Sequence, residues 1–309
     1  MKRQIRFSHL VVALSFASVL SVGGVVYLGY RFLLNEFPNV EPLKTQYPVV
    51  IYRGRSFEPD VVLKRGRPDS WVSLSQVSRG AVGAIIVSED WSFYGHKGYD
   101  PHEIKEAIKE DLAAGSFVRG ASTITQQVAK NVFLSHEKSL WRKFKELILA
   151  MELEEKVGKR RILEAYLNVA EWGEGVFGIH RAARVYFGKH PSQLTAKEGA
   201  FLAMLLPSPK KYSVSFRARK LTPYARKTMS SIMNKMVRAQ YLSPEDRQVQ
   251  WSTPLSFEAV GAVQSGMAPE EVGEEEADES DEEVSAESGN SAENLTAGRS
   301  ENEANQENF

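Results

Sequence analysis

The chain has 309 residues, of which 42% are hydrophobic and 25% charged, a composition typical of one or two globular domains. It contains no cysteine, which excludes disulfide bonds and thiolate chemistry. The net charge of zero hides an uneven distribution, because residues 270–309 hold 15 acidic residues and one basic residue. The other 269 residues hold 38 basic and 24 acidic side chains, and this balance of +14 favours an anionic partner such as nucleic acid, anionic lipid or a phosphorylated substrate.

An uncharged segment, Leu10–Tyr30, lies close to the N-terminus. Its 21 residues, at a helical rise of ~1.5 Å each, would span the ~30 Å hydrocarbon core of a bilayer. A cleaved signal peptide is the alternative, but the segment is longer than the usual ~7–15 apolar residues and no small-x-small site follows it. Lys2, Arg3 and Arg6 precede it, which predicts a cytoplasmic N-terminus. We therefore expect residues 1–32 to form a cytoplasmic end and a retained transmembrane anchor.

The segments on either side of the central region show few signs of a core. Residues 33–72 are proline-rich and are expected to be a juxtamembrane connector with one short strand at Val49–Tyr52. From Ser265 the chain has no aromatic residue until Phe309 and is dominated by small, polar and acidic residues. Such a segment cannot bury a core, so residues 249–309 are predicted to be an acidic, disordered tail.

The central region, residues 73–248, shows helical periodicity and almost no strand signal, which predicts a mainly α domain. Ser75 is the expected cap of a helix that ends at Glu89, and Thr195 with Glu198 forms a capping box. Apolar stripes place Ile108, Leu112, Leu140, Phe144 and Met151 in the core. The other expected helices are Asp100–Gly115, Ser122–Phe133, Lys138–Glu155, Lys159–Ala170, Ile179–Phe187, Thr195–Leu206 and Thr222–Gln240.

Two carboxylates, Glu89 and Asp90, lie within the stretch SEDWSFYGHKGYD at the expected end of the first helix. Carboxylates at a helix C-terminus oppose the helix dipole at a cost of a few tenths of a kcal/mol or more, so a purely structural role explains them poorly. His96 follows between Gly95 and Gly98, where either a site role or a structural hydrogen bond is open. The pattern predicts a reactive carboxylate at a cleft.

A second stretch, GASTITQQVAKN, supplies polar groups about thirty residues later. On a helix, Thr123, Gln127, Lys130 and Asn131 share one face, and this face is too rich in hydroxyl and amide groups to be an ordinary solvated one. We interpret it as a second wall of the same site. Arg142 and Glu146 lie four residues apart on a following helix, where an exposed ion pair is the alternative to a site role.

Five blocks of this chain, within Ser73–Tyr212, resemble in order the signatures of the monofunctional, membrane-anchored peptidoglycan glycosyltransferases, the murein transglycosylases that polymerise lipid II. The first two are Glu89-Asp90-x-x-Phe93-x-x-His96-x-Gly98-x-Asp100 and Gly120-Ala121-Ser122-Thr123-Ile124-Thr125-Gln126-Gln127-x-x-Lys130-Asn131. The others are Arg142-Lys143-x-x-Glu146 with Ala150 and Glu154, Ile162-Leu163-Glu164-x-Tyr166-Leu167-Asn168, and Gly175-x-x-Gly178-Ile179 through Ala182, Ala183, Tyr186, Phe187 and Gly188. The closing turn after Pro207 and the acidic tail depart from the family pattern.

The resemblance implies a helical, lysozyme-like domain with a small membrane-proximal lobe. It implies transfer of a lipid-linked glycan from undecaprenyl pyrophosphate to the 4-hydroxyl of the next lipid II, with inversion. Glu89 would be the general base, and Lys130 and Arg142 would bind the pyrophosphate. Glu146 would either orient Arg142 or help to hold a divalent cation, Mg²⁺ or Mn²⁺. The supporting residues that would position substrate are Asp90, His96, Thr123, Gln127 and Asn131.

The expected partners are lipid II, the lipid-linked glycan, the membrane and other cell-wall synthases, with neither nucleic acid nor an organic cofactor. The expected location is the inner membrane, with the catalytic domain on the periplasmic side. Phe117, Val118 and Phe133 could dip into lipid or pack in the core. The alternatives are a muramidase or lytic transglycosylase, which would not need the pyrophosphate cations, and a non-catalytic anchored scaffold.

Overall fold

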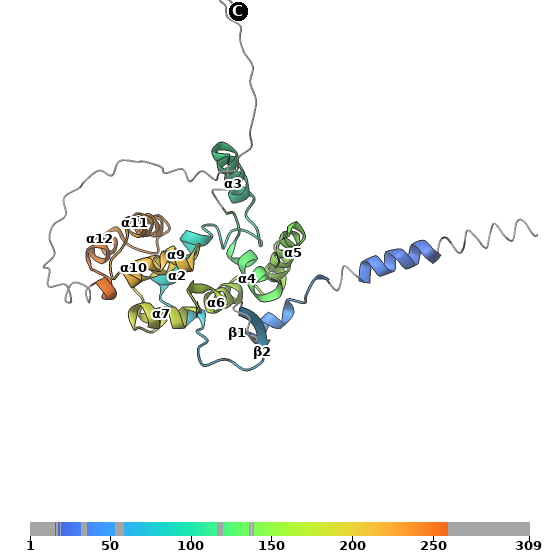
Figure 1. Cartoon of the computed structure of the whole chain (residues 1–309), viewed down its shortest axis with the longest axis horizontal. Helices are drawn as coiled ribbons and strands as arrows, with labels where there is room; N and C mark the ends of the chain where they lie inside the picture. Colours follow the sequence, from blue (N-terminus) through green and yellow to red (C-terminus); the bar gives the residue numbers. More distant parts are fainter. Residues whose placement is uncertain are drawn as a thin grey trace, which may run out of the picture. The chain divides into compact units, whose positions relative to one another are not determined.

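A computed structural model of the chain describes residues 16, 18, 20–31, 36–52, 59–115, 120–135, 137 and 139–258 (Figure 1). Helices dominate these residues, as the sequence predicts. The helices are α2 (Arg79–Glu89), α3 (Pro101–Ala114), α4 (Ile124–Phe133), α5 (Leu140–Lys156), α6 (Lys159–Val169), α7 (Ile179–Phe187), α8 (Ala196–Leu205), α9 (Pro209–Tyr212), α10 (Val214–Arg217), α11 (Pro223–Arg238) and α12 (Pro244–Ser252). The shorter elements are η1 (Glu41–Lys44), η2 (Leu74–Gln76), η3 (Pro191–Gln193), β1 (Tyr47–Tyr52), β2 (Pro59–Lys64), β3 (Glu171–Gly173) and β4 (Val176–Phe177).

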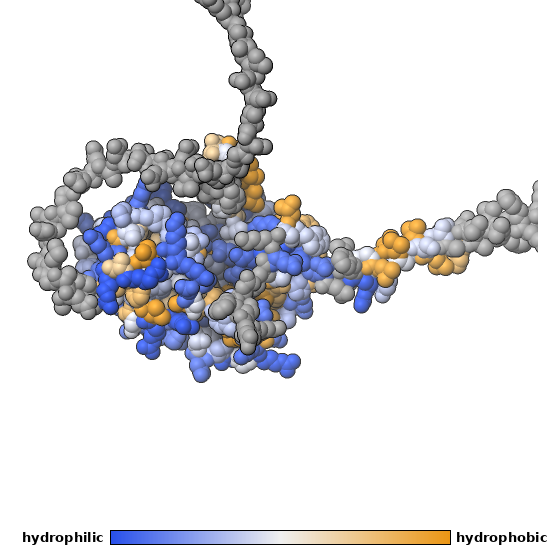
Figure 2. All heavy atoms as spheres, in the orientation of Figure 1, coloured by the Kyte–Doolittle hydropathy of each residue, from blue (hydrophilic) through white to orange (hydrophobic). Residues whose placement is uncertain are grey.

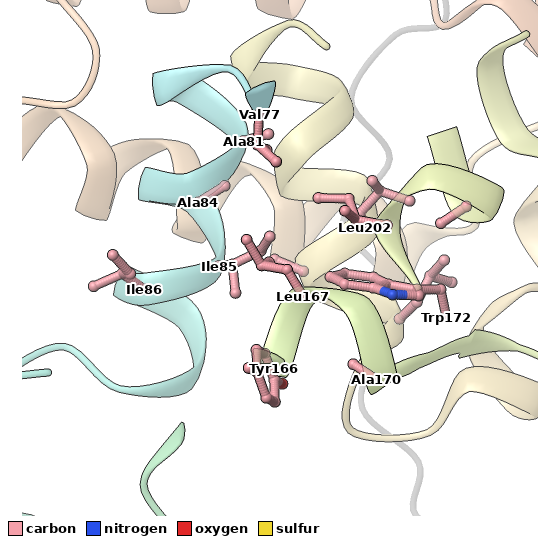
Figure 3. Packing of buried hydrophobic residues seen from close by; sticks show 14 of the residues in the cluster. Val77, Ala81, Ala84, Ile85, Ile86, Tyr166, Leu167, Ala170, Trp172 and Leu202 are labelled. Carbon is pink, nitrogen blue, oxygen red and sulfur yellow. The ribbon is translucent and has the colours of Figure 1, made fainter. Parts of the chain in front are cut away.

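The helix that ends at Glu89 is buried along its middle, from Ala81 to Val87 except for the half-buried Val82. Ser78, rather than the predicted Ser75, caps α2 by accepting a hydrogen bond from the backbone N–H of Ala81. α2 packs on α8 so closely that a Cβ on Gly199 would lie 2.5 Å from the Cα of Ala81. Ala84, Ile85, Leu167, Trp172 and Leu202 gather around this contact (Figure 3). The first turn of α2 is therefore held at close distance by α8, and Ile85 continues the buried contact towards Glu89.

The predicted connector folds as a hairpin against the helices. β1 contains the predicted strand Val49–Tyr52 and pairs antiparallel with β2, which the sequence analysis missed. The side chain of Arg161, on α6, donates to the backbone oxygens of Leu43 and Gln46 at 2.9 and 2.8 Å. Its guanidinium also lies over the ring of Trp71, 4.8 Å from the centroid. Residues 40–52 and 59–72 thus belong to the folded body.

The apolar stripes of α3 and α5 do not face the core as predicted. Leu112 and Leu140 are 77% and 92% exposed, and Ile108, Phe144 and Met151 are also exposed. Hydrophobic side chains are visible on the surface in this part of the molecule (Figure 2). The prediction was wrong because α5 buries the opposite set, Leu149, Ala150 and Leu153 together with Glu146. Phe133 packs against the core, whereas Phe117 and Val118 lie outside the described residues.

The folded body extends beyond the predicted boundary at residue 248. Phe257 is buried, and its ring packs against those of Phe187, Phe201 and Phe216, with centroid distances of 5.2–6.3 Å. Lys197 donates to the backbone oxygens of Trp251 and Thr253, which fastens the end of α12 to α8. Residues 259–309, the rest of the predicted tail, lie outside the described residues.

The N-terminal segment is described only in part. Residues 20–31 form a helix with exposed side chains, whereas residues 1–15, which include the start of the predicted anchor, are not among the described residues. Within the described ranges, no helix combines the length and the hydropathy needed to cross a membrane.

Candidate active site

Glu89 is the last residue of α2, and its carboxylate is held by two other helices. Gln127 Nε2, on α4, donates to Glu89 Oε2 at 3.0 Å, and Tyr166 OH, on α6, donates to the same oxygen at 3.4 Å. Glu89 Oε1 has no hydrogen-bond partner among the described residues. Burial raises the pKa of Glu89, and the hydrogen bonds from Gln127 and Tyr166 oppose this rise. The result is a carboxylate with one fixed oxygen and a raised affinity for protons.

Asp90, the neighbouring carboxylate, joins the two polar stretches. It is 7% exposed and accepts hydrogen bonds from His96 Nε2 at 2.8 Å and from the backbone N–H of Ile124 at 2.9 Å. Because Ile124 is the first residue of α4, the Asp90 carboxylate also faces the positive end of that helix dipole. Of the two roles left open for His96, the contact favours the structural one, and Asp90 and His96 together fix α4 beside Glu89.

The start of α4 is locked by Thr123. Thr123, rather than the predicted Ser122, is the N-cap, and it forms a capping box with Gln126. Its hydroxyl donates to the backbone oxygen of Gly98 at 2.7 Å. Gly98 has φ +94°, and a Cβ there would lie 2.8 Å from the backbone carbon of Ala150, so only glycine fits. Thr123 is buried, and its contacts bring the two stretches together from within the fold.

A first cavity, of about 310 Å³, lies beside the polar face of α4. Gln127, Lys130 and Asn131 line it together with Tyr166 and residues of β1 and β2. The Lys130 ammonium is not paired with any carboxylate in the described part of the chain. Partial burial lowers the pKa of Lys130, and the nearby charge of Glu146 opposes this shift. Three residues of the predicted face thus line one cavity, whereas Thr123, the fourth, is not among its lining residues.

The predicted pair of Arg142 and Glu146 does not form. Glu146 is 3% exposed and pairs instead with Lys143, whose ammonium lies 2.5 Å from Glu146 Oε1 and also donates to Ser122 Oγ at 2.7 Å. Arg142 Nε is buried and has no hydrogen-bond partner in the described residues. The i,i+4 spacing was misleading because Lys143, three residues before Glu146, contacts both the Glu146 carboxylate and the Ser122 hydroxyl. Arg142 is left free to bind an anion.

A second cavity, of about 330 Å³, lies on the other wall of the site. Glu89 and Asp90 line it, together with Trp91 and with Lys235 and Arg238 of α11. The sequence analysis assigned no role to the last three. A tryptophan directly after the two carboxylates was the available signal for Trp91, but nothing local signals that α11, some 145 residues later, packs beside it.

Tyr166 was also missed as a site residue, although it lies in one of the matched blocks. Its side chain is 1% exposed, and its hydroxyl lies 3.3 Å from Gln127 Oε1 as well as near Glu89. Burial and the charge of Glu89 raise the pKa of Tyr166 well above its ordinary value, so it remains a neutral donor. On the sequence alone, its place in the apolar stripe of α6 makes it look like a core residue.

The described residues contain no group of three or more His, Asp or Glu side chains placed to hold a metal ion. Glu146, the predicted metal ligand, is engaged by Lys143. A protein-built divalent-cation site does not fit this set of donors.

The described residues form a mainly helical protein in which the Glu89 carboxylate is hydrogen-bonded to two residues that line a cavity with Lys130. A family model described as Transglycosylase matches residues 60–237. The biosynthetic peptidoglycan transglycosylase of Nitrosomonas eutropha is 45% identical over 162 residues, which cover 52% of this chain and 66% of that protein. The protein of the same name from Paraburkholderia xenovorans is 44% identical over 183 residues, covering 58% of this chain and 75% of that one.

Penicillin-binding protein 1A of Aquifex aeolicus is 37% identical over 186 residues, which cover 60% of this chain but 25% of that longer protein. The chain thus spans just under two thirds of the Nitrosomonas relative and a quarter of this one. Because the family model covers more than half of the chain, the chain belongs to the transglycosylase family.

Proposed function

We propose that the chain polymerises lipid II into linear glycan strands of cell-wall peptidoglycan. The growing glycan leaves its undecaprenyl pyrophosphate, and its anomeric carbon is joined with inversion to the 4-hydroxyl of the next lipid II. One observation carries the proposal. Gln127, which donates to the Glu89 carboxylate, lines one cavity with Lys130, a cation without an acidic partner in the described residues. The charge of Arg142, whose Nε has no acceptor among those residues, acts on Lys130. The names of the relatives support the same reaction.

Glu89 acts as the general base. A sugar hydroxyl is a weak nucleophile, so a carboxylate within hydrogen-bond reach must take its proton as the attack proceeds. The raised pKa of Glu89 makes it a better proton acceptor than an exposed glutamate. Gln127 and Tyr166 hold Oε2, which leaves Oε1 to receive the proton.

Lys130 and Arg142 stabilise the pyrophosphate as it leaves. Negative charge develops on the leaving oxygen, and cations fixed in advance stabilise it without reorganisation. The arginine offers a fork of donors and the lysine a point charge. A buried Arg142 Nε without a protein acceptor costs ~1–3 kcal/mol unless a ligand oxygen accepts from it, which favours an anion in this position. The nearby negative charge of Glu146 opposes the lowering of the Lys130 pKa that burial causes.

Any requirement for Mg²⁺ or Mn²⁺ would then arise from the diphosphate of the substrate, with no protein-built site. We expect chelation to slow polymerisation by weakening substrate binding while the Tm of the free protein stays unchanged. A fall in Tm on chelation would instead point to a metal bound by the protein itself.

We also propose that the protein is anchored in the inner membrane, with its catalytic domain on the periplasmic side and other cell-wall synthases as partners. Leu10–Tyr30 is uncharged and long enough to span the bilayer. The large apolar side chains Leu140 and Trp141 are exposed at the start of α5. Glu36 Oε2 accepts hydrogen bonds from Trp141 Nε1 at 3.2 Å and Lys145 Nζ at 2.9 Å, so the chain after the anchor leads to this helix. The exposed apolar side chains at the start of α5 could contact the membrane in which a lipid-linked substrate lies.

The test is Glu89→Gln in a polymerisation assay with lipid II in detergent. The rate is expected to fall by ~10²–10⁴-fold while lipid II binding persists. Because burial raises the pKa of Glu89, its stability contribution belongs to the protonated form and is lost as pH rises through the shifted pKa. A neutral glutamine avoids this loss, so the Tm of the variant at neutral pH should equal or exceed that of the wild type.

Near-normal polymerisation by the Glu89→Gln variant would overturn the assignment of the base. Purified sacculi serve as the second substrate. Cleavage of sacculi without polymerisation of lipid II would assign the protein to the lytic class instead.

A further inference from the structure

We propose that Trp91, Lys235 and Arg238 form a binding subsite for the acceptor substrate, in which a sugar ring packs on Trp91 and an anionic group lies against the two cations. The proposal rests on the proposed function and deepens it, since it assigns the second substrate of the polymerisation to the second cavity. None of the three residues belongs to the polar stretches that carry Glu89, Lys130 and Arg142.

Trp91 is poorly explained as a structural residue. Its side chain is 48% exposed although it directly follows the buried Asp90. An indole left half in water loses much of the free energy that its burial would contribute. Its ring can pack on the apolar face of a pyranose, and its N–H, which has no acceptor in the described part of the chain, can donate to a sugar oxygen.

Lys235 and Arg238 supply positive charge in the same cavity. They lie three residues apart on α11 and so share one face of it. The guanidinium carbon of Arg238 lies 5.8 Å from the centre of the Trp91 ring, a cation–π contact that positions both groups. Neither cation has an ion pair with a described carboxylate.

Four carboxylates also line this cavity, those of Glu89, Asp90, Asp100 and Glu103, and none of them forms an ion pair with Lys235 or Arg238 among the described residues. Asp90 is engaged by His96 and by the start of α4, and Asp100 caps α3 through the backbone N–H groups of His102 and Glu103. The cavity therefore offers two cations to a ligand.

The position of Glu89 explains why the reaction needs a second subsite. Glu89 lines the Trp91 cavity, whereas Gln127 and Tyr166, which hold its carboxylate, line the Lys130 cavity, so the residue lies between the two cavities. A hydroxyl bound in the Trp91 cavity thus lies next to the base, and a leaving pyrophosphate fits the Lys130 cavity. At about 330 Å³ the Trp91 cavity is at the small end of ligand pockets, which suits one or two sugar rings.

The anionic group of the acceptor is either its diphosphate or the carboxylates of its stem peptide. Two lipid-free probes separate these sources: the GlcNAc–MurNAc disaccharide diphosphate without peptide, and the disaccharide peptide without diphosphate. Binding to the full chain is measured by calorimetry and by quenching of tryptophan fluorescence. The variants are Trp91→Ala, Lys235→Ala and Arg238→Ala, and Lys227→Ala, an exposed lysine of α11 outside both cavities, is the matched control.

Trp91→Ala should weaken binding of both probes by about tenfold, the loss of one good contact, because both probes carry the sugar rings. Lys235→Ala and Arg238→Ala should each weaken binding of one probe by about the same factor, while Lys227→Ala binds as the wild type does. For the two cation variants, loss confined to the diphosphate probe identifies the diphosphate, and loss confined to the peptide probe identifies the carboxylates. Wild-type affinity of all three variants for both probes would overturn the subsite. Failure of the wild-type chain to polymerise lipid II would overturn the proposed function instead. Binding of the probes is measured independently of polymerisation, so the two failures can be distinguished.

Discussion

The two helices α2 and α5 both contribute to the site, but they are held in the molecule in different ways. α2 buries most of its middle turns, contacts α8 at backbone distance and ends at Glu89. α5 buries one narrow face and exposes Leu140, Trp141 and Phe144. Glu89 is therefore attached to the buried core. Arg142 belongs to a helix whose apolar surface is exposed and could contact a membrane.

This difference suggests that α2 supports proton transfer and α5 supports binding of the lipid-linked pyrophosphate. Proton transfer depends on distances of about 3 Å, so the base gains from an immobile support. A pyrophosphate attached to a membrane lipid stays at the membrane surface. A cation that binds it, such as Arg142, is therefore well placed on a helix that contacts the membrane. Substitutions at the contact between α2 and α8 should therefore lower the stability of the fold. Substitutions of the site residues should lower the reaction rate. Substitutions on the exposed face of α5 should affect only membrane binding.

The largest effect is expected from Gly199→Ala. The added Cβ would lie 2.5 Å from the Cα of Ala81, and backbone atoms cannot yield as a flexible side chain can. Overpacking of this kind costs ~1–3 kcal/mol or more. It would displace the first turn of α2 and, through this helix, Glu89 at its other end. We expect a lower Tm and, in the folded fraction, slower polymerisation. Gly66→Ala, at an open glycine, is the control, and equal Tm values for the two variants would contradict the tight contact of α2 with α8.

Much of this core could be predicted from the sequence. The end of α2 at Glu89, the cap at Asp100, the capping box of Thr195 and the end of α7 at Phe187 all depend on signals within a few residues. The faces of α3 and α5 could not be predicted in the same way. An apolar stripe shows that a surface avoids water, but it does not distinguish a protein core from another apolar surrounding.

The next effect, on chemistry alone, is expected from Lys130→Ala. Removing a fixed cation from the leaving-group site should lower kcat by ~10²–10³-fold, as the loss of one preorganised charge or donor does. Lys130 has no protein partner in the described residues, so the Tm should hardly change. Lys130→Arg keeps the charge and is expected to recover part of the rate. A full rate for Lys130→Ala would place the pyrophosphate elsewhere.

Some residues of the site could be predicted from local sequence, as the helix ends could, and others could not, like the buried faces of α3 and α5. Glu89, Gln127, Lys130 and Asn131 were found because their types and spacing are chemically unusual. Tyr166 was not, because a buried tyrosine in an apolar stripe looks like packing until its hydroxyl is placed beside a carboxylate. Contacts made by residues distant in sequence are set by tertiary packing, which local patterns do not encode.

A smaller effect, visible in the pH profile, is expected from Tyr166→Phe. The hydrogen bond from Tyr166 opposes the rise in the pKa of Glu89 that burial causes. Its loss should raise that pKa further, so the acid limb of the rate profile should move to higher pH while the rate above the limb changes little. The measurement is polymerisation rate against pH for the variant and the wild type. An unmoved limb would show that Tyr166 does not act on the base.

The smallest effect on stability, and the sharpest contrast with Gly199, is expected from Leu140→Ser. Leu140 is 92% exposed, so its replacement should change the free energy of unfolding by no more than ~0.5 kcal/mol. If the outer face of α5 contacts lipid, the variant should bind vesicles less well and polymerise membrane-embedded lipid II more slowly, with an unchanged rate in detergent. Leu149→Ser, on the buried face of the same helix, is the control and should unfold the domain. Equal vesicle binding by the wild type and Leu140→Ser would remove the membrane role of α5 and leave its exposed stripe unexplained.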